Sequence, residues 1–204
     1  MRKLIISLLS LSVFLMTPFI TTFAQEGGFG AEFRLKSWEL HKKMEEISPF
    51  RDLVWRAAGP EQQSSRVESI AIHPDYPNTI YMGFGSGNLW KSINNGTTWD
   101  PIFEDEATFA IGCVSIAPSD PEIIWVGTGE VLMARSSYSG LGAYKSTDGG
   151  KTWKNMGLAD TYHIHRIVID PENPDIVYAA AMGHNFTFNK AFYKSKGFIL
   201  LFVI

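Results

Sequence analysis

The chain has little cysteine, no excess of basic charge and few charged residues overall. Cys113 is the single cysteine among 204 residues, so an internal disulfide is excluded. A formal net charge of −3 provides no basic footprint for nucleic acid. Charged residues make up 19% and apolar residues 45% of the chain, which is typical of a globular protein with a sizeable core. We therefore expect neither a disulfide scaffold nor a nucleic-acid partner.

Nothing in the sequence around Cys113 activates its thiol. The residue lies in the alternating segment 111–116, without a nearby base or cation. A thiol in such a strand packs like a small apolar side chain, whereas a nucleophilic cysteine needs a positive neighbour. We interpret Cys113 as a core residue.

The amino terminus carries an extended apolar run. Residues 4–16 are apolar apart from serines, and they follow Arg2 and Lys3. The run is too short to span a membrane comfortably as a helix of about 20 residues, and small residues precede Gln25. This pattern predicts a signal peptide over residues 1–24, cleaved before Gln25. The mature chain is then secreted, periplasmic or on the cell surface, with no membrane span of its own.

A linker and a short helix are expected over residues 25–50. Residues 25–36 are rich in glycine, and we expect no regular structure there. In the segment from Ser37 to Ile47, Leu40, Met44 and Ile47 share one helical face. Ser37 is the expected N-cap of this helix.

From Val67 the apolar pattern changes to period two and repeats three times. The segments 69–83, 113–127 and 166–180 each contain a strand, a Pro-x-x-Pro turn and a second strand. Pro74, Pro118 and Pro171 occupy the same place in each segment and lie 44 and 53 residues apart. This period is typical of four-stranded β-propeller blades. We predict an all-β partial propeller of about three blades over residues 51–195, the last one incomplete.

A second signal follows in the first two repeats. Residues 89–99 and 143–153 both contain an aromatic residue, Lys-Ser, a polar turn and Thr-Trp. The turn contains residues that tolerate positive φ, and its Asn or Asp side chain can accept hydrogen bonds from backbone N–H groups. We assign a structural role to the residues of these two turns: Ser92, Asn94, Gly96, Trp99, Ser146, Asp148, Gly150 and Trp153.

These turns resemble the Asp-box, or BNR repeat. Residues 146–153 match it at every defining position, and residues 92–99 match it with Asn94 in place of Asp. Asp-boxes occur in sialidases, in xyloglucanase-type glycoside hydrolases and in sortilin-type receptors. With the motifs at residues 55–60, 66–67, 73–74 and 127–130, the chain most resembles large bacterial exported proteins with sortilin-like propellers. The resemblance implies a module that binds protein, peptide or glycan without a cofactor, with its Asp-boxes away from the ligand face.

A glycoside hydrolase is the alternative function. A sialidase needs a cluster of arginines for its carboxylate substrate; Arg66 and Arg135 are available, but an early Arg-Ile-Pro segment is absent. A xyloglucanase-type enzyme needs two carboxylates. The resemblance implies an Asp after the strand at residues 80–84, where this chain has Gly85. We therefore assign no catalytic residue, and in this alternative the carboxylates lie in later blades. Residues 104–106 are interpreted as a solvated acidic loop.

The predicted ligand surface is the insertion at residues 127–140 of the second repeat. Long loops on propeller blades commonly carry binding residues. Here Glu130 and Arg135 offer charge, and Tyr138 offers an aromatic ring.

Two histidines in the third repeat raise the question of a metal. His163 and His165 share a strand face and His184 follows later, but no third ligand has a convincing spacing. We predict no metal site.

The third repeat departs from the pattern after Ser195. Residues 196–204 form an apolar tail instead of the expected polar turn. This departure suggests a truncated or frame-shifted copy of a longer protein. An incomplete set of blades leaves sheet faces open, so we expect the chain alone to fold poorly or to associate.

Overall fold

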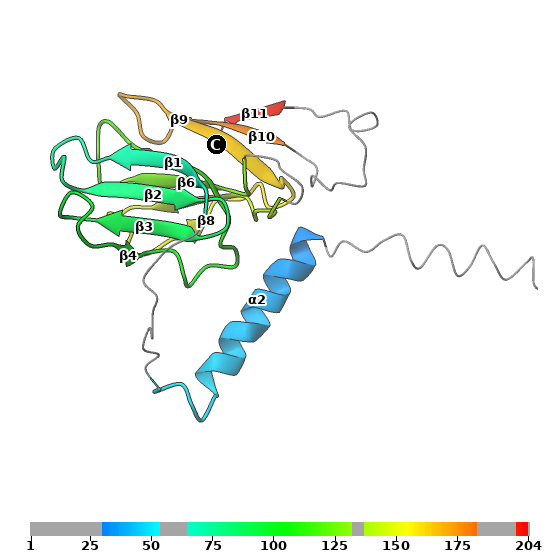
Figure 1. The fold of residues 1–204 in the computed structure, drawn as a ribbon. Helices are drawn as coiled ribbons and strands as arrows, with labels where there is room; N and C mark the ends of the chain where they lie inside the picture. The colour runs from blue at the N-terminus through cyan, green and yellow to red at the C-terminus, as the bar shows by residue number, and fades with distance from the viewer. Residues whose placement is uncertain (1–29, 54–64, 132–136, 183–198, 204) are drawn as a thin grey trace, which may run out of the picture.

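The computed structural model describes residues 30–53, 65–131, 137–182 and 199–203. The predicted signal peptide and the motif at residues 55–60 lie outside these ranges. Apart from one helix, the described elements are antiparallel strands arranged in three sheets (Figure 1). Within the described ranges, no helix combines the length and the apolar character that crossing a membrane demands.

Each sheet is built from strands that follow one another along the chain, because each Pro-x-x-Pro segment turns the chain back on itself. The first sheet contains β1 (Val67–Ile72), β2 (Ile80–Phe84), β3 (Asn88–Ser92) and β4 (Asp100–Pro101). The second contains β5 (Ile111–Ile116), β6 (Ile124–Thr128), β7 (Ala143–Ser146) and β8 (Lys154–Asn155). The third contains β9 (His163–Ile169), β10 (Val177–Met182) and β11 (Ile199–Val203).

The three sheets pack face to face in a row. Their first strands lie next to one another, with β5 in contact with both β1 and β9. Successive antiparallel sheets with adjacent first strands are the arrangement of propeller blades. The predicted all-β class and the positions of the paired strands in the three repeats are therefore confirmed. The end of the apolar tail forms β11 beside β10, in the place that β3 and β7 hold in the other two sheets.

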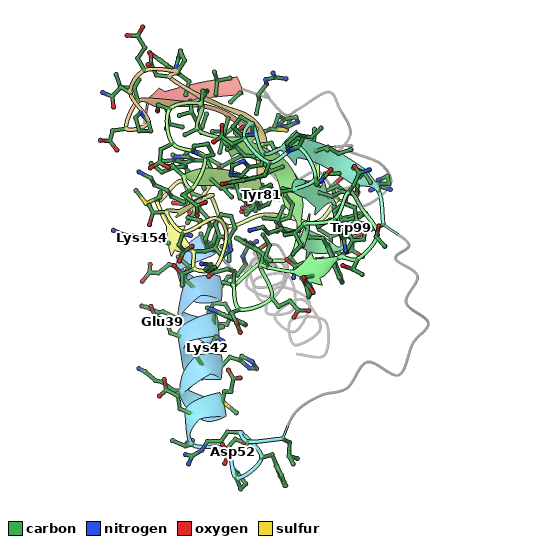
Figure 2. All side chains as sticks on the ribbon, turned by 90° about the vertical axis from the view of Figure 1, so that its left-hand side faces the viewer. Glu39, Lys42, Asp52, Tyr81, Trp99 and Lys154 are labelled. Carbon is green, nitrogen blue, oxygen red and sulfur yellow. The ribbon has the colours of Figure 1, made fainter. Side chains whose placement is uncertain are left out.

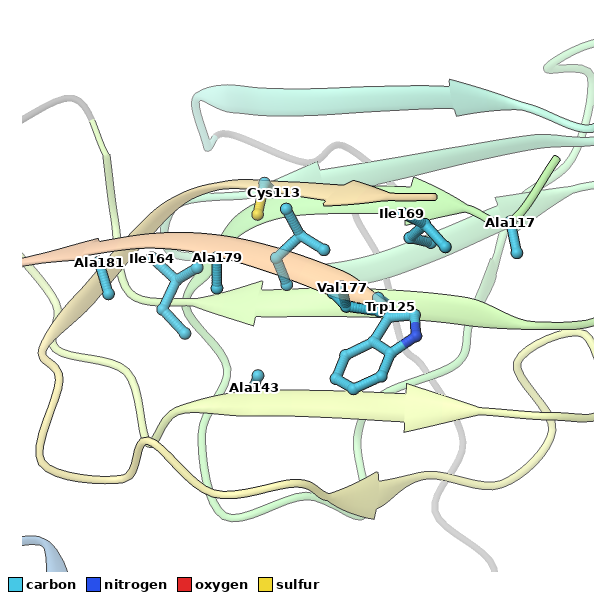
Figure 3. Close-up of a cluster of buried hydrophobic side chains, with 10 residues drawn as sticks. Cys113, Ala117, Trp125, Ala143, Ile164, Ile169, Val177, Ala179 and Ala181 are labelled. Atoms are coloured by element: carbon cyan, nitrogen blue, oxygen red, sulfur yellow. The ribbon is translucent and has the colours of Figure 1, made fainter. Parts of the chain in front are cut away.

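The core consists of two apolar clusters, one between each pair of neighbouring sheets. Between the first and second sheets, Tyr81 and Leu89 pack with Ile124 and Val126. Between the second and third sheets, Trp125 packs with a set of small and β-branched side chains (Figure 3). Cys113 belongs to this second cluster and is only 6% exposed. Burial raises the pKa of its thiol to about 12, in agreement with the predicted core role.

The helix begins earlier than the sequence predicted. Helix α2 spans Ala31–Glu46 and follows Gly30, which makes no side-chain cap. Ser37 is not an N-cap, because it lies inside the helix, where its hydroxyl donates to the carbonyl of Phe33 at 2.8 Å. The strong helix formers that surround Phe33 extend the helix toward the amino terminus.

Helix α2 projects from the sheets and contacts them at separate points (Figures 1 and 2). The guanidinium of Arg34 donates to Ser139 Oγ at 2.6 Å and to the carbonyl of Gly140. Farther along the helix, Lys42 Nζ lies 3.1 Å from Asp105 Oδ1. None of the residues of α2 is buried, so its predicted apolar face exists but is not packed in the described structure.

Candidate functional site

The two ends of the sheets carry different kinds of connection. Because the strands are antiparallel, the Pro-x-x-Pro turns and the polar turns after β3 and β7 lie at one end, which we call the turn end. The connections at residues 85–87 and 107–110 lie at the other end, together with residues 129–131 and 137–142, and we call this the loop end.

The polar side chains of the two turns form hydrogen bonds within the turns themselves. In the second sheet, the Asp148 carboxylate accepts from the N–H groups of Lys151 and Thr152, both at 2.9 Å, and from the hydroxyl of Thr152 at 2.6 Å. Ser146 Oγ donates to the same carboxylate and accepts from the N–H of Gly150. The hydrogen bonds from Thr152 lower the pKa of Asp148 to about 2. The carboxylate is thus committed to the turn.

The first sheet builds the same turn with an amide. Asn94 Oδ1 accepts from the N–H of Thr98 at 2.9 Å, and Ser92 Oγ accepts from the N–H of Gly96 at 2.8 Å. The backbone has positive φ at Asn95 and Gly96, as it has at both glycines of the second turn. The predicted need for residues that tolerate positive φ is therefore confirmed.

At the loop end, the first strand of every sheet carries a β-bulge at the same place. The register skips Glu68 in β1, Gly112 in β5 and His165 in β9. A bulge reorients the side chain of the extra residue and is common next to functional sites. The repeated bulge therefore sets three equivalent positions apart from the regular pleat.

Two carboxylates converge on Gly85, the position where the xyloglucanase resemblance implies an Asp. A Cβ atom at Gly85 would lie 2.9 Å from Glu68 Oε1 and 3.0 Å from Glu130 Cγ. Both glutamates are almost completely withdrawn from solvent, with side chains 6% and 0% exposed. The two glutamate side chains therefore occupy the space that a larger residue at position 85 would need.

Arg66 joins these two carboxylates. Its guanidinium pairs with Glu130 across the boundary between the first two sheets, and its Nε lies 3.8 Å from Glu68 Oε1. The other oxygen of Glu130 accepts from the N–H of Tyr138 at 3.1 Å. The Glu130 N–H in turn donates to the Tyr138 carbonyl at 2.9 Å. Glu130 thus ties the base of the insertion to the first sheet.

An aromatic pair stands beside these charges. The rings of Phe109 and Tyr138 meet edge to face with centroids 5.2 Å apart, and the two residues are 48% and 49% exposed. The N–H of Asn88 donates to the Phe109 carbonyl at 2.9 Å, which places Phe109 beside the connection that contains Gly85. Large apolar side chains held half-exposed at a loop edge are suited to contact a ligand.

The structure places the predicted ligand residues in different environments. Tyr138 is accessible, whereas Glu130 is buried and engaged by Arg66 and Tyr138. Arg135 lies outside the described residues. Sequence reasoning missed Glu68, because a glutamate inside an alternating strand looks like a solvent-facing residue. When the three repeats are aligned, Glu68 falls at the same position as Gly112 and His165, and this shared position was the one signal that could have drawn attention to it.

His165 lies within electrostatic range of the same cluster. Burial lowers its pKa, whereas a backbone hydrogen bond and the charge of Glu68 act in the opposite direction. His163 precedes it on β9 and is completely buried. In the part of the chain that the structure describes, no group of three or more His, Cys, Asp or Glu side chains is placed to hold a metal ion.

A hollow of about 580 Å³ separates the outer part of the first sheet from the polar turn of the second, and its lining includes Lys91, Glu106 and Trp153. Glu106 is not simply solvated, as the sequence had suggested. Burial, together with the charge of Asp105, raises its pKa to about 7, and Lys42 acts in the opposite direction.

No protein-family model matches this chain. The chain is 32% identical over 91 residues to a protein of Neosartorya fischeri named as an oligoxyloglucan-reducing end-specific xyloglucanase, covering 44% of this chain and 10% of that protein. It is 27% identical over 143 residues to a xyloglucanase of Hypocrea jecorina and 29% identical over 147 residues to one of Paenibacillus. These matches cover 60% and 64% of this chain. The chain spans only 10% to 17% of the length of these relatives.

Solved structures match similar shares of the chain. The GH74 enzyme of Niastella koreensis is 26% identical with a TM-score of 0.46, over 57% of this chain and 17% of that one. YCF48 from Cyanidioschyzon merolae is 17% identical with a TM-score of 0.42, over 60% of this chain and 38% of that one.

Proposed function

We propose that this chain contributes to a propeller-type glycoside hydrolase that acts on β-glucans such as xyloglucan, and that its loop end binds the glucan. The observation that carries the proposal is the half-exposed pair of Phe109 and Tyr138 beside the carboxylates at Gly85. The substrate class comes from the xyloglucanases to which the chain is similar. Such a polysaccharide is extracellular, which agrees with the predicted export.

The chemistry of a glucan fits this edge. The C–H faces of glucose rings pack on aromatic rings, while the hydroxyl groups at the ring edges donate to carboxylates. Phe109 and Tyr138 supply the apolar surface beside the carboxylates at Gly85. Arg135 stays a predicted contact of the same insertion.

The described residues are better suited to binding than to cleavage. Glycoside hydrolysis uses two carboxylates, one on either side of the scissile bond. Glu130 is held by Arg66 and by the Tyr138 N–H, so we assign it a structural role. Arg66 also pairs with Glu68, whose side chain is 6% exposed, so in this proposal the catalytic carboxylates would come from outside the described residues.

Electrophoresis of the full chain through a native gel containing soluble xyloglucan tests the proposal. Binding slows migration relative to a gel without polysaccharide. We expect Phe109→Ala and Tyr138→Ala each to weaken this retardation about tenfold, since stacking contacts of this size contribute about 1 kcal/mol or more.

Tyr76→Ala is the matched control. Tyr76 is 66% exposed but lies in the Pro-x-x-Pro turn at the turn end, so its loss should leave the retardation unchanged. The proposal fails if the unmodified chain is not retarded, or if the three substitutions weaken retardation equally.

A further inference from the structure

The two faces of each sheet differ, and the difference repeats along the row. Three aromatic residues occupy one equivalent register position: Tyr81 pairs with Ala71, Trp125 with Ser115, and Tyr178 with Val168. Each lies on the second strand of its sheet. Tyr81 and Trp125 point toward the side on which the next sheet packs, and Tyr178 holds the same register position on the third sheet. We call this side the aromatic face.

The opposite side of each sheet is aliphatic. In the second sheet, Val114 and Ile124 pack against the aromatic face of the first sheet. In the third sheet, Ile169 and Val177 pack with Trp125 (Figure 3), and Ile167 belongs to the same cluster. The equivalent positions in the first sheet are Ile70, Ile72 and Ile80. We call this side the aliphatic face.

Both internal joints therefore have the same composition, an aromatic face against an aliphatic face. At these joints Tyr81 is 0% and Trp125 is 2% exposed. A lysine from the third strand stands over each ring, Lys91 at 5.2 Å from Tyr81 and Lys145 at 5.6 Å from Trp125. One rule thus describes how neighbouring sheets of this chain join.

Among the described sheets, one face of each kind is not packed against another described sheet. On the first sheet, Ile70 and Ile72 are 56% and 58% exposed. On the third sheet, Tyr178 is 39% and Val168 is 50% exposed. Exposed apolar patches of this kind on a soluble protein mark interaction surfaces. One open face is aromatic and the other is aliphatic, so together they have the composition of each internal joint.

We propose that a second copy of this chain closes the row. The aromatic face of each third sheet packs on the aliphatic face of the first sheet of the other copy, so both open faces are covered in a dimer. Head-to-tail joints of this kind form closed rings when their rotation adds up to a full turn. The described strands form three sheets, so two copies supply six, within the range of about four to eight blades in known propellers. This inference does not depend on the glucan proposal.

Sedimentation equilibrium of the full chain tests it, with Ile70→Lys and Tyr178→Glu as the decisive variants. We expect the unmodified chain to have twice the mass of one chain, in a reversible equilibrium. Each substitution buries a charge at a joint, so each should weaken dimerisation at least about tenfold. An equimolar mixture should restore the dimer, because one joint then pairs the new lysine with the new glutamate and the other is unmodified.

Ile93→Lys is the control. Ile93 is 65% exposed in the polar turn after β3 and lies on neither face, so this variant should dimerise normally. Circular dichroism confirms that each variant is folded, and Ile72→Lys replaces Ile70→Lys if the latter is not. A monomer at all concentrations overturns the proposal, as does a mixture that fails to restore the dimer or a control that behaves like Ile70→Lys.

Discussion

Gly85 illustrates how a single residue can mislead a comparison of sequences. The resemblance to xyloglucanases implied a carboxylate at this position, and its absence counted against hydrolysis. In the structure, Glu68 of β1 and Glu130 of the connection after β6 reach the same place, and a Cβ at position 85 would be in their way. A carboxylate can thus be present at a site although the residue expected to carry it is missing.

Cys113 provides a prediction at this scale. Its thiol is buried between the second and third sheets, and burial raises its pKa to about 12. A thiol reacts through its thiolate form and only when it is accessible. We therefore expect native protein to react with a disulfide reagent such as dithionitrobenzoate at least about a hundredfold more slowly than the unfolded chain. Equal rates with and without denaturant would show that the joint opens freely.

The polar turns are the best-defined short elements, and they differ in a useful way. Asp148 and Asn94 hold equivalent turns through the same side-chain oxygen, Oδ1. The second polar atom of each side chain contacts the threonine hydroxyl, since Asp148 Oδ2 accepts from Thr152 Oγ1 and Asn94 Nδ2 donates to Thr98 Oγ1. The turn therefore depends mainly on the shared oxygen and less on the charge.

This dependence predicts the order of two substitutions. Asp148→Ala removes the acceptor from the N–H groups of Lys151 and Thr152 and should lower the free energy of unfolding by about 1–2 kcal/mol. Asp148→Asn keeps that acceptor and should cost less than about half as much. Denaturant unfolding curves measure both. If the two variants are equally unstable, the charge rather than the acceptor geometry holds the turn.

The elements were predictable where local rules decide them. Prolines and alternating β-branched residues located the paired strands, because turns and pleats have short-range causes. The start of α2 was not predictable from Ser37, since a serine inside a helix can bond backward to a carbonyl. The strand β11 was missed because the tail lacks the repeat motif and owes its place to pairing with β10.

At the scale of the whole molecule, the sequence predicted the succession of sheets but not the cluster at the loop end. Repeats and their period are visible along the chain, whereas the meeting of Arg66, Glu68 and Glu130 depends on two sheets packing side by side. Only Glu130 of the two glutamates was singled out, and for contact with a ligand rather than for the ion pair it forms. A contact between two repeats produces no sequence motif within either repeat, so it cannot be recognised from the repeat pattern.

The pH dependence of stability also belongs to this scale, because Glu106 lies near the place where Lys42 of α2 meets the first sheet. Its folded-state pKa of about 7 is above the ordinary value of 4.5, so the folded protein holds this proton more tightly than the unfolded chain. Stability should therefore fall as the pH rises from 4.5 through 7. Because Glu106 is partly exposed, solvent screening limits the expected effect to about 1 kcal/mol.

Thermal unfolding of Glu106→Gln provides the comparison. A neutral amide cannot ionise, so the variant should lose less stability than the unmodified chain between pH 5 and pH 7.5. Glu104→Gln, in the exposed part of the same loop, is the matched control and should behave like the unmodified chain. Identical pH profiles for the unmodified chain and Glu106→Gln would contradict the assignment.

The unlike faces of the sheets also have a consequence for how such a gene can change. A repeat with two identical faces would need partners that are redesigned together whenever a copy is gained or lost. Here each sheet presents an aromatic side and an aliphatic side, so a duplicated copy brings the right surface for the neighbour before it and for the neighbour after it. Insertion or deletion of whole repeats then leaves every remaining joint intact. Recombination can therefore change the number of sheets without producing an intermediate protein that misfolds.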